Sequence, residues 1–362
     1  MLRVFKPELK ELVDAGTGRK IRQLTDVACI NHHPLFLIPA YDNAMQWLFF
    51  VSHRLGSPQI FGLERDTYRI VQFTDIQDLN EWSVHPDLSG EFVYFTTKTG
   101  GWRLELQTAK VESLFAYGKG AATAAGMVAG GMGTTALSPH GIFWAYPHNT
   151  ADGVRIMKCD TRDGAISEIT THDAVAHMQF CPDDDTLLYF AGNFIERLWT
   201  VKVDGTEKTK HGKREKGQWI THESWVPHRR ELMYVDWPHA VRAVSIDDGT
   251  TRIIASINTW HAICDPSGKY VVADTNWPDI GIQIFDTAGK LTPRTLCYPQ
   301  ASNAGAHWKD PFPYENGPIK VYAPQHTHPH PRFSPDRSKI VYTSDRTGFP
   351  QLYEFDTADL GI

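Results

Sequence analysis

The sequence predicts an all-β protein with the architecture of a seven-bladed β-propeller, and three observations support this. A unit of turn and strand recurs seven times at intervals of about 40 to 50 residues, the period of four-stranded propeller blades. The units are rich in β-branched and aromatic residues and have almost no helical periodicity. The last unit is one strand short, and a lone strand lies near the N-terminus.

Each unit begins with a turn that contains Pro, Asp or Gly and continues into an apolar strand. The turns and following strands are 41–43 with 48–51, 85–87 with 92–95, 138–141 with 142–145, 181–184 with 187–190, 226–228 with 232–235, 265–268 with 270–273, and the continuous unit 334–345. Residues 20–24 form the lone N-terminal strand, and pairing it with the last unit would close the ring and remove an open sheet edge.

We therefore expect a single domain that spans residues 1–362. Residues 1–16 are expected to form an N-terminal extension with a short helix at 7–15. Two insertions interrupt the repeat, a glycine- and alanine-rich segment at 118–135 and a longer one at 301–323. Long loops in a tight repeat commonly carry function.

Composition excludes several classes of protein. The net charge is −6, and no basic surface is available for phosphate backbones, so we expect no nucleic-acid partner. No run of about 18 apolar residues exists, so we expect no membrane span. The first residues lack an apolar signal region, and five cysteines are scattered without paired spacing. These features predict a cytoplasmic protein with reduced thiols.

A dense group of polar side chains at 325–330 is the strongest local signal of a functional site. Gln325, His326, His328 and His330 occupy four of the six positions 325–330, just before the last repeat. Imidazole nitrogens and an amide oxygen suit a divalent cation such as manganese or zinc. The alternative is a polar loop whose histidines only bond their neighbours. If the segment is extended, His326 points away from His328 and His330.

The turn proline of each repeat serves as a ruler that relates the histidines to one another. The position five residues before this proline is occupied by Glu81, Thr134, His177, His222, His261 and His330 in successive repeats. Equivalent positions of successive blades form a ring around the propeller axis. Four adjacent blades therefore place a histidine at the same height. Such a ring makes a poor core, because every buried imidazole needs a polar partner, so we expect a shared site.

The chemistry that these residues favour is proton abstraction next to a carboxylate. Glu223 follows His222, but consecutive side chains of a strand point to opposite faces, so the two need not both serve the site. No Ser-His-Asp arrangement or carboxylate pair stands out. A metal would neutralise the substrate carboxylate, a neutral histidine would remove the α-proton, and an arginine would stabilise the developing charge.

The chain resembles the oligogalacturonate lyases, the seven-bladed propellers of polysaccharide lyase family 22. The resemblance spans nearly the whole chain in blade order. It is sharpest at residues 221–225 (THESW), in the Q-x-x-H-x-H pattern that begins at Gln325, and at 343–345 with 351–353.

The resemblance implies a set of roles for the candidate residues. His261, Gln325, His328 and His330 would be metal ligands, and the family's metal is typically manganese. His222 would be the base that takes the C5 proton of the uronate. Arg197 would stabilise charge or bind the substrate carboxylate, and His177 would line the same subsites. The reaction would be β-elimination on short pectic oligosaccharides, which leaves a 4,5-unsaturated uronate.

Three alternatives remain at this point. Residues 31–34 and the glycine-rich segment differ from the family pattern, so a lyase for another uronate, such as rhamnose-linked glucuronate, is possible. A non-catalytic propeller that binds a sugar or a protein predicts no metal. A metal-dependent hydrolase or lactonase is disfavoured, because such sites use carboxylate and amide oxygens rather than three histidines.

Overall fold

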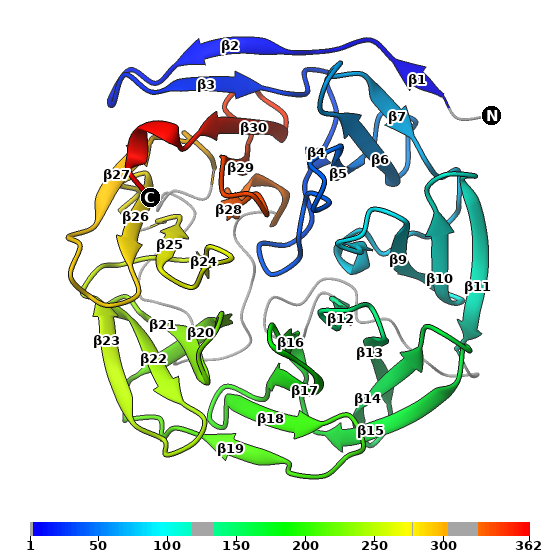
Figure 1. Ribbon diagram of the computed structural model, residues 1–362, viewed down its shortest axis with the longest axis vertical. Coiled ribbons are helices and arrows are strands. Elements are labelled where there is room, and N and C mark those ends of the chain that lie inside the picture. Colours follow the sequence, from blue (N-terminus) through cyan, green and yellow to red (C-terminus); the bar gives the residue numbers. More distant parts are fainter. Residues whose placement is uncertain (1–2, 118–132, 277, 303–324) are drawn as a thin grey trace.

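The computed structural model describes residues 3–117, 133–276, 278–302 and 325–362. Within these residues seven antiparallel sheets stand in a ring around a central axis, with the first strand of each sheet nearest the axis (Figure 1). The predicted seven-bladed propeller is thus confirmed. The second strands of the blades are apolar and closely packed. In the first blade, for example, Leu48, Phe49, Phe50 and Val51 are fully buried.

The strands of the first four blades follow one another in chain order. Blade one contains β4 (Asn31–His32), β5 (Trp47–Ser52), β6 (Gln59–Glu64), β7 (Ile70–Gln72) and, at its outer edge, β1 (Val4–Phe5). Blade two contains β8 (His85–Pro86), β9 (Phe92–Thr97), β10 (Gly100–Glu105) and β11 (Lys110–Ala116). Blade three contains β12 (Ala136–Leu137), β13 (Phe143–Thr150), β14 (Gly153–Asp160) and β15 (Ile166–His172). Blade four contains β16 (Ala176–Cys181), β17 (Asp184–Ala191), β18 (Leu198–Lys202) and β19 (Thr209–His211).

The last three blades complete the ring. Blade five contains β20 (Trp219–Val226), β21 (Glu231–Trp237), β22 (Ala240–Ser245) and β23 (Thr251–Ala255). Blade six contains β24 (Ala262–Cys264), β25 (Tyr270–Ala273), β26 (Ile282–Asp286) and β27 (Arg294–Cys297). Blade seven contains β28 (Arg332–Phe333), β29 (Lys339–Ser344), β30 (Gln351–Asp356), β3 (Lys20–Gln23) and β2 (Lys10–Val13). Short 3₁₀ turns lie at η1 (Glu81–Ser83), η4 (Gln325–Thr327) and η5 (Ala358–Leu360).

The N-terminal segment closes the ring as predicted. Strand β3 pairs antiparallel with β30, so that Arg22 lies opposite Glu354 and Gln23 opposite Tyr353. Arg22 also forms a salt bridge of 2.7 Å with Asp356 at the end of β30. These contacts join the two ends of the chain and leave no unpaired edge between them.

The helix predicted at 7–15 is wrong. Residues Lys10–Val13 instead form β2, which pairs antiparallel with β3 and extends blade seven, while β1 extends blade one. The predicted extension 1–16 thus supplies edge strands to two blades. Helix propensity is a weak signal over so short a segment, and pairing with an adjacent strand satisfies the backbone better. Residues 118–132 and 303–323 of the two predicted insertions lie outside the described residues.

The turn that follows the first strand of blade six packs closely against blade five. In blade six the Asp265 carboxylate accepts hydrogen bonds from the Lys269 and Tyr270 amides, each 2.9 Å long. Gly268 in this turn has φ +67°, and a Cβ there would lie 2.2 Å from the Pro227 carbonyl oxygen of blade five. A side chain at this position would therefore push two blades apart.

No helix in the described part of the chain is long and apolar enough to cross a membrane.

Candidate metal centre and active site

The four histidines of the shared register come together near the axis. They arise from four consecutive blades, and the ring centroids are 5.5 Å apart for His177 and His222, 4.3 Å for His222 and His261, and 4.2 Å for His261 and His330. All four side chains are buried. The repeat register thus predicts which histidines are neighbours in space.

Three of these histidines share an uncommon backbone conformation. The φ angles are +48° at His177, +49° at His222 and +46° at His330. Residues other than glycine rarely adopt this left-handed conformation, which costs on the order of 1 kcal/mol or more and is concentrated at functional sites. In blades four and five a bulge in the strand register occurs at the same point.

The bulge in β20 corrects the expectation that Glu223 points away from the site. Because His222 is left-handed, strand alternation is interrupted there. The Glu223 carboxylate, fully buried, accepts hydrogen bonds from His177 Nδ1 at 2.7 Å and from Arg197 Nε at 2.6 Å. Both partners lower the pKa of Glu223 to about 2 in spite of its burial, so the carboxylate is ionised. Glu223 thus holds Arg197 and His177 beside His222.

A second subset of the histidines has the arrangement of a metal site. The ligand atoms of His261, His328 and His330 all lie within 4.8 Å of one another, and all three side chains are buried. His261 and His330 are the register histidines of blades six and seven, and His328 precedes β28.

The Asp274 carboxylate fixes the orientation of two of these residues. It accepts a hydrogen bond from His261 Nδ1 at 2.8 Å and one from the His330 backbone amide at 3.1 Å. Because a carboxylate only accepts, His261 Nδ1 carries a proton, and in the neutral imidazole the lone pair is then on Nε2. Histidine ligands of metals usually donate their second nitrogen to a carboxylate in this way.

The donor set fits a divalent cation. His330 Nε2 is buried and has no hydrogen-bond partner within the described residues, which is costly unless a ligand occupies the site. Imidazole nitrogens gathered around one buried point suit manganese or zinc. The pKa of His330 is well below its usual value because of burial and the neighbouring histidines, so the ring is neutral.

The other two candidate residues of 325–330, Gln325 and His326, do not share one position with these ligands. Gln325 begins η4, immediately before these histidines, but its side chain lies outside the described residues, and its role as a ligand stays a prediction. His326 lies apart from the three-histidine group. Its Nε2 is 2.8 Å from the Glu81 carboxylate.

His222 has the properties of a general base. Burial and the nearby His261, His177 and Arg197 lower its pKa well below the usual value, so the imidazole is neutral and can accept a proton. Its ring packs at 4.6 Å from Trp260, and its Nδ1 has no hydrogen-bond partner in the part of the chain that the structure describes. Sequence reasoning alone did not identify Trp260 beside the candidate base.

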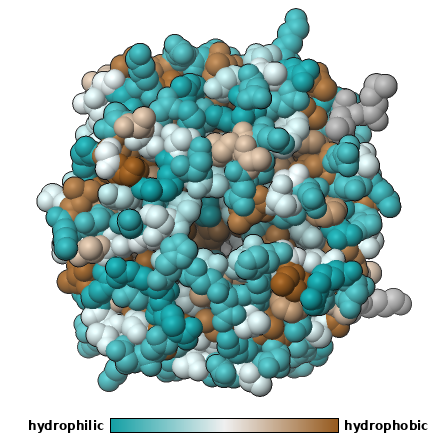
Figure 2. Space-filling model, in the orientation of Figure 1, coloured by the Kyte–Doolittle hydropathy of each residue, from teal (hydrophilic) through white to brown (hydrophobic). Residues whose placement is uncertain are grey.

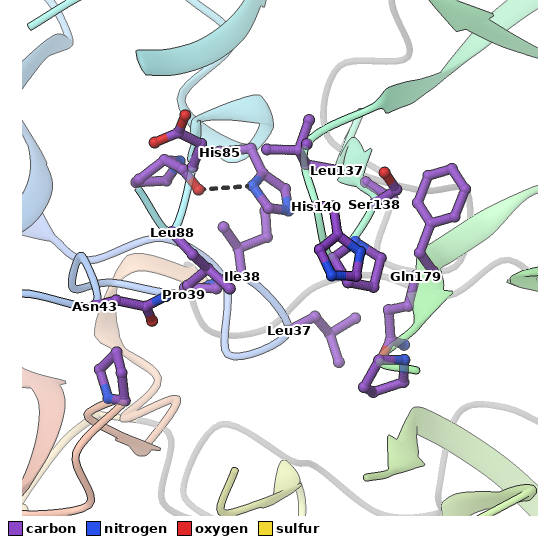
Figure 3. Close-up of a pocket in the computed structure, with 18 of the residues that line it drawn as sticks. Leu37, Ile38, Pro39, Asn43, His85, Leu88, Leu137, Ser138, His140 and Gln179 are labelled. Atoms are coloured by element: carbon purple, nitrogen blue, oxygen red, sulfur yellow. Dashed lines mark hydrogen bonds between the residues drawn. The ribbon is translucent and has the colours of Figure 1, made fainter. Parts of the chain in front are cut away.

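The segment that follows β4 contacts the histidine group and also lines a separate cavity. Phe36 contacts the histidine group, with its ring centroid 4.9 Å from that of His261. Its neighbours Leu37 and Ile38 line a cavity of about 810 Å³ at the other end of the first strands (Figure 3). The turn prolines also line that cavity, and none of His177, His222, His261, His328 and His330 does. Figure 2 shows a hollow near the centre of the face seen down the ring.

Sequence reasoning missed the acidic partners of the site. Asp274 lies just after β25 and reaches His261 across the blade, so only the paired strands bring them together. Glu223 was noticed, but strand alternation gave no reason to include it in the site. The signal for Glu223 was its place next to a register histidine, and no local pattern marks Asp274.

Comparison with known proteins points to one family. A family profile described as oligogalacturonate lyase matches residues 140–360. An oligogalacturonide lyase of Pectobacterium atrosepticum is 22% identical over 94% of each chain. An oligogalacturonate lyase of Dickeya dadantii is 26% identical over 55% of this chain and 54% of its own.

Two solved structures share the fold. An oligogalacturonate lyase in complex with manganese superposes with a TM-score of 0.84 at 20% identity and covers 98% of this chain and 97% of its own. An oligogalacturonate lyase from Vibrio parahaemolyticus gives a TM-score of 0.83 at 18% identity, with 99% of each chain covered. At these identities the likeness shows the seven-bladed fold.

Proposed function

The chain belongs to the oligogalacturonate lyase family, and we propose that it is a metal-dependent lyase that cleaves short oligogalacturonates by β-elimination. The observation that carries this proposal is the contact between a neutral, buried histidine and a group of three histidine ligands. The ring centroids of His222 and His261 are only 4.3 Å apart. A base and a cation site at this separation can act on one uronate, whose carboxylate and C5 proton are adjacent.

The metal would be held by His261, His328 and His330, with Gln325 as the fourth ligand, and manganese is the ion we propose. When bound, the ion supplies positive charge that neutralises the uronate carboxylate and acidifies the C5 proton. The related lyase solved with manganese supports the choice of ion. Asp274 would keep His261 Nε2 free for coordination, because it holds the proton on Nδ1.

The protein groups would divide the proton transfer and the charge between them. His222 removes the C5 proton, a C4–C5 double bond forms, the C4–O4 bond breaks, and the departing oxygen takes up a proton. Arg197 binds the substrate carboxylate or stabilises the charge that develops. Its guanidinium is held by Glu223 at 2.6 Å and is buried, so its position is set before substrate arrives. His177 lines the same subsite.

The experiment that tests this function incubates the purified protein with digalacturonate and Mn²⁺ and follows the ultraviolet absorbance of the unsaturated product. We expect activity that a chelator abolishes, that added Mn²⁺ restores, and that His222→Ala lacks. Activity that survives both the chelator and this substitution would refute the mechanism. A panel of other uronate oligosaccharides distinguishes galacturonate from rhamnose-linked glucuronate.

A non-catalytic propeller makes the opposite prediction. It would bind sugar equally well after replacement of His261 or His330, and it would retain no metal. Elemental analysis of the protein as purified separates the two.

We further propose that the protein acts in the cytoplasm on pectic fragments. Its five cysteines are all unpaired, and four of them are buried, which suits a reducing compartment. Cell fractionation with an antibody tests this placement, and recovery in a secreted fraction would contradict it.

A further inference from the structure

A second group of histidines surrounds Glu81, away from the three ligands described above. The Glu81 carboxylate lies 2.8 Å from His326 Nε2, 2.8 Å from His53 Nε2 and 3.3 Å from His32 Nε2. The ligand atoms of His32, Glu81 and His326 all lie within 4.8 Å of one another. The Nε2 atoms of three imidazoles thus point at one carboxylate.

The group is assembled from four separate segments of the chain. Glu81 begins η1 and occupies the register position that carries histidines in blades four to seven. His32 ends β4, His53 follows β5, and His326 lies in η4. The indole of Trp82 lies against this group and faces the first one, at 4.4 Å from the His32 ring, 5.3 Å from His326 and 6.1 Å from His330. The two groups are therefore neighbours across a single aromatic side chain.

The tautomer of His32 shows that hydrogen bonds alone do not satisfy this arrangement. His32 Nδ1 lies 2.9 Å from the His33 carbonyl oxygen. A carbonyl oxygen only accepts, so the ring proton is on Nδ1. In the neutral imidazole, Nε2 then carries a lone pair, and this lone pair faces a carboxylate oxygen at 3.3 Å. His53 and His326 can donate to Glu81, but a neutral His32 cannot.

Two arrangements remove this repulsion, a second proton on His32 or a cation between His32 and Glu81. The His32 side chain is only 2% exposed, so a charged ring would lose almost all of its hydration. A histidine that donates Nδ1–H to a backbone carbonyl and presents Nε2 beside a carboxylate has the usual geometry of a metal ligand.

We propose that His32, His53, Glu81 and His326 bind a second divalent transition-metal ion, separate from the ion of the three-histidine group. Three imidazole nitrogens and one carboxylate oxygen are donors that zinc accepts in tetrahedral sites. Ligand atoms on one such ion are about 3.3 Å apart. The ligand atoms of His32, Glu81 and His326 already lie within 4.8 Å of one another, and His53 Nε2 lies 2.8 Å from Glu81, so side-chain shifts would bring the four onto one ion. The side chains of Glu81, His53 and His326 are 19%, 24% and 21% exposed, so an ion can enter from solvent.

Metal stoichiometry tests this proposal without any substrate. The full-length protein is stripped with a chelator, loaded with Zn²⁺, passed through a desalting column and analysed for zinc per chain. We expect two equivalents in the wild type and one in Glu81→Gln, which preserves the shape of the side chain. His261→Ala should also bind one equivalent, and the double variant should bind none. His140→Ala, which changes an exposed histidine outside both groups, should keep two.

Several outcomes would overturn the proposal. If the wild type binds only one equivalent and Glu81→Gln keeps it, the Glu81 group binds no metal. Two equivalents in Glu81→Gln would lead to the same conclusion. If Glu81→Gln unfolds, as judged by circular dichroism, His53→Ala at the rim replaces it and should also lose one equivalent. Nitrogen-15 NMR of the histidines gives an independent readout, because zinc should shift His32 Nε2 while Nδ1 stays protonated. A doubly protonated His32 with no response to zinc would contradict the proposal. Since no step needs turnover, failure here leaves the proposed lyase activity untouched.

Discussion

Asp274→Asn, compared with a matched control, tests whether Asp274 supports metal binding in addition to folding stability. The carboxylate is fully buried and accepts three hydrogen bonds, from the His261 amide at 2.7 Å, from His261 Nδ1 at 2.8 Å and from the His330 amide at 3.1 Å. An asparagine has one oxygen and one NH₂ group, so it cannot accept all three. If its oxygen keeps the bond to the His261 amide, its NH₂ group faces His261 Nδ1–H and the His330 amide, which are both donors.

The consequence for His261 is a change of tautomer. The ring can accept from the asparagine NH₂ group only if its proton moves to Nε2, the atom that faces the other histidines. The site then loses a ligand unless the proton is displaced. Changes in such partners of metal-binding histidines lower metal affinity by about 10- to 100-fold, which corresponds to about 1.4 to 2.8 kcal/mol. The His330 amide also loses its acceptor, so folding stability should fall by about 1 to 3 kcal/mol.

Asp265→Asn is the matched control. Asp265 is a fully buried aspartate of the same blade that bonds the Lys269 and Tyr270 amides and pairs with Arg337 at 2.7 Å, away from the histidines. Manganese affinity is measured by calorimetry on both variants, and stability by urea unfolding of the metal-free proteins. We expect both to lose stability but only Asp274→Asn to lose affinity. Wild-type affinity in Asp274→Asn, or an equal loss in both, would refute the role of Asp274.

Three further predictions follow from the same structure. His222→Ala should lower kcat by about 10²- to 10⁴-fold while manganese binding persists, as steady-state kinetics and calorimetry on one sample will show; loss of both together would mean that His222 is structural. The Arg22 guanidinium and Lys339 lower the pKa of Asp356 to about 2, so this group stabilises the fold above about pH 4 and its contribution disappears as the pH falls towards 2. Because the pair is partly exposed, Asp356→Asn should cost about 1 kcal/mol or less at pH 7 and markedly less at pH 2 in urea titrations. An equal cost at both pH values would exclude the ion pair. Burial raises the pKa of the Cys159 thiol to about 11 and those of Cys264 and Cys297 further, so a thiol reagent should modify only Cys29 quickly in the native protein, and fast reaction of several thiols would contradict the packing.

The fold could be predicted almost completely from the repeat. The turn proline and the apolar strand after it mark each blade, and strand spacing then places His177, His222, His261 and His330 at one height. The position of each blade strand is therefore determined by the local sequence. The error at 7–15 arose where the local pattern was short and a long-range strand pair decided the conformation.

The partners of the site could not be predicted, because they depend on contacts between distant segments. Glu223 faces the site only because His222 is left-handed, and strand alternation gives no sign of this. Asp274 reaches His261 through antiparallel pairing. The Glu81 group draws on blades one and two and on η4, so His326, which the sequence separates from His328 and His330, acquires a different partner.

The central claim is that this site performs elimination rather than hydrolysis, and mass spectrometry of the products tests it most directly. Digalacturonate treated with the manganese-loaded protein should give galacturonate and one product that is lighter than galacturonate by the elements of water. Two molecules of galacturonate as the only products, or an unsaturated product formed equally well by His222→Ala, would contradict the account.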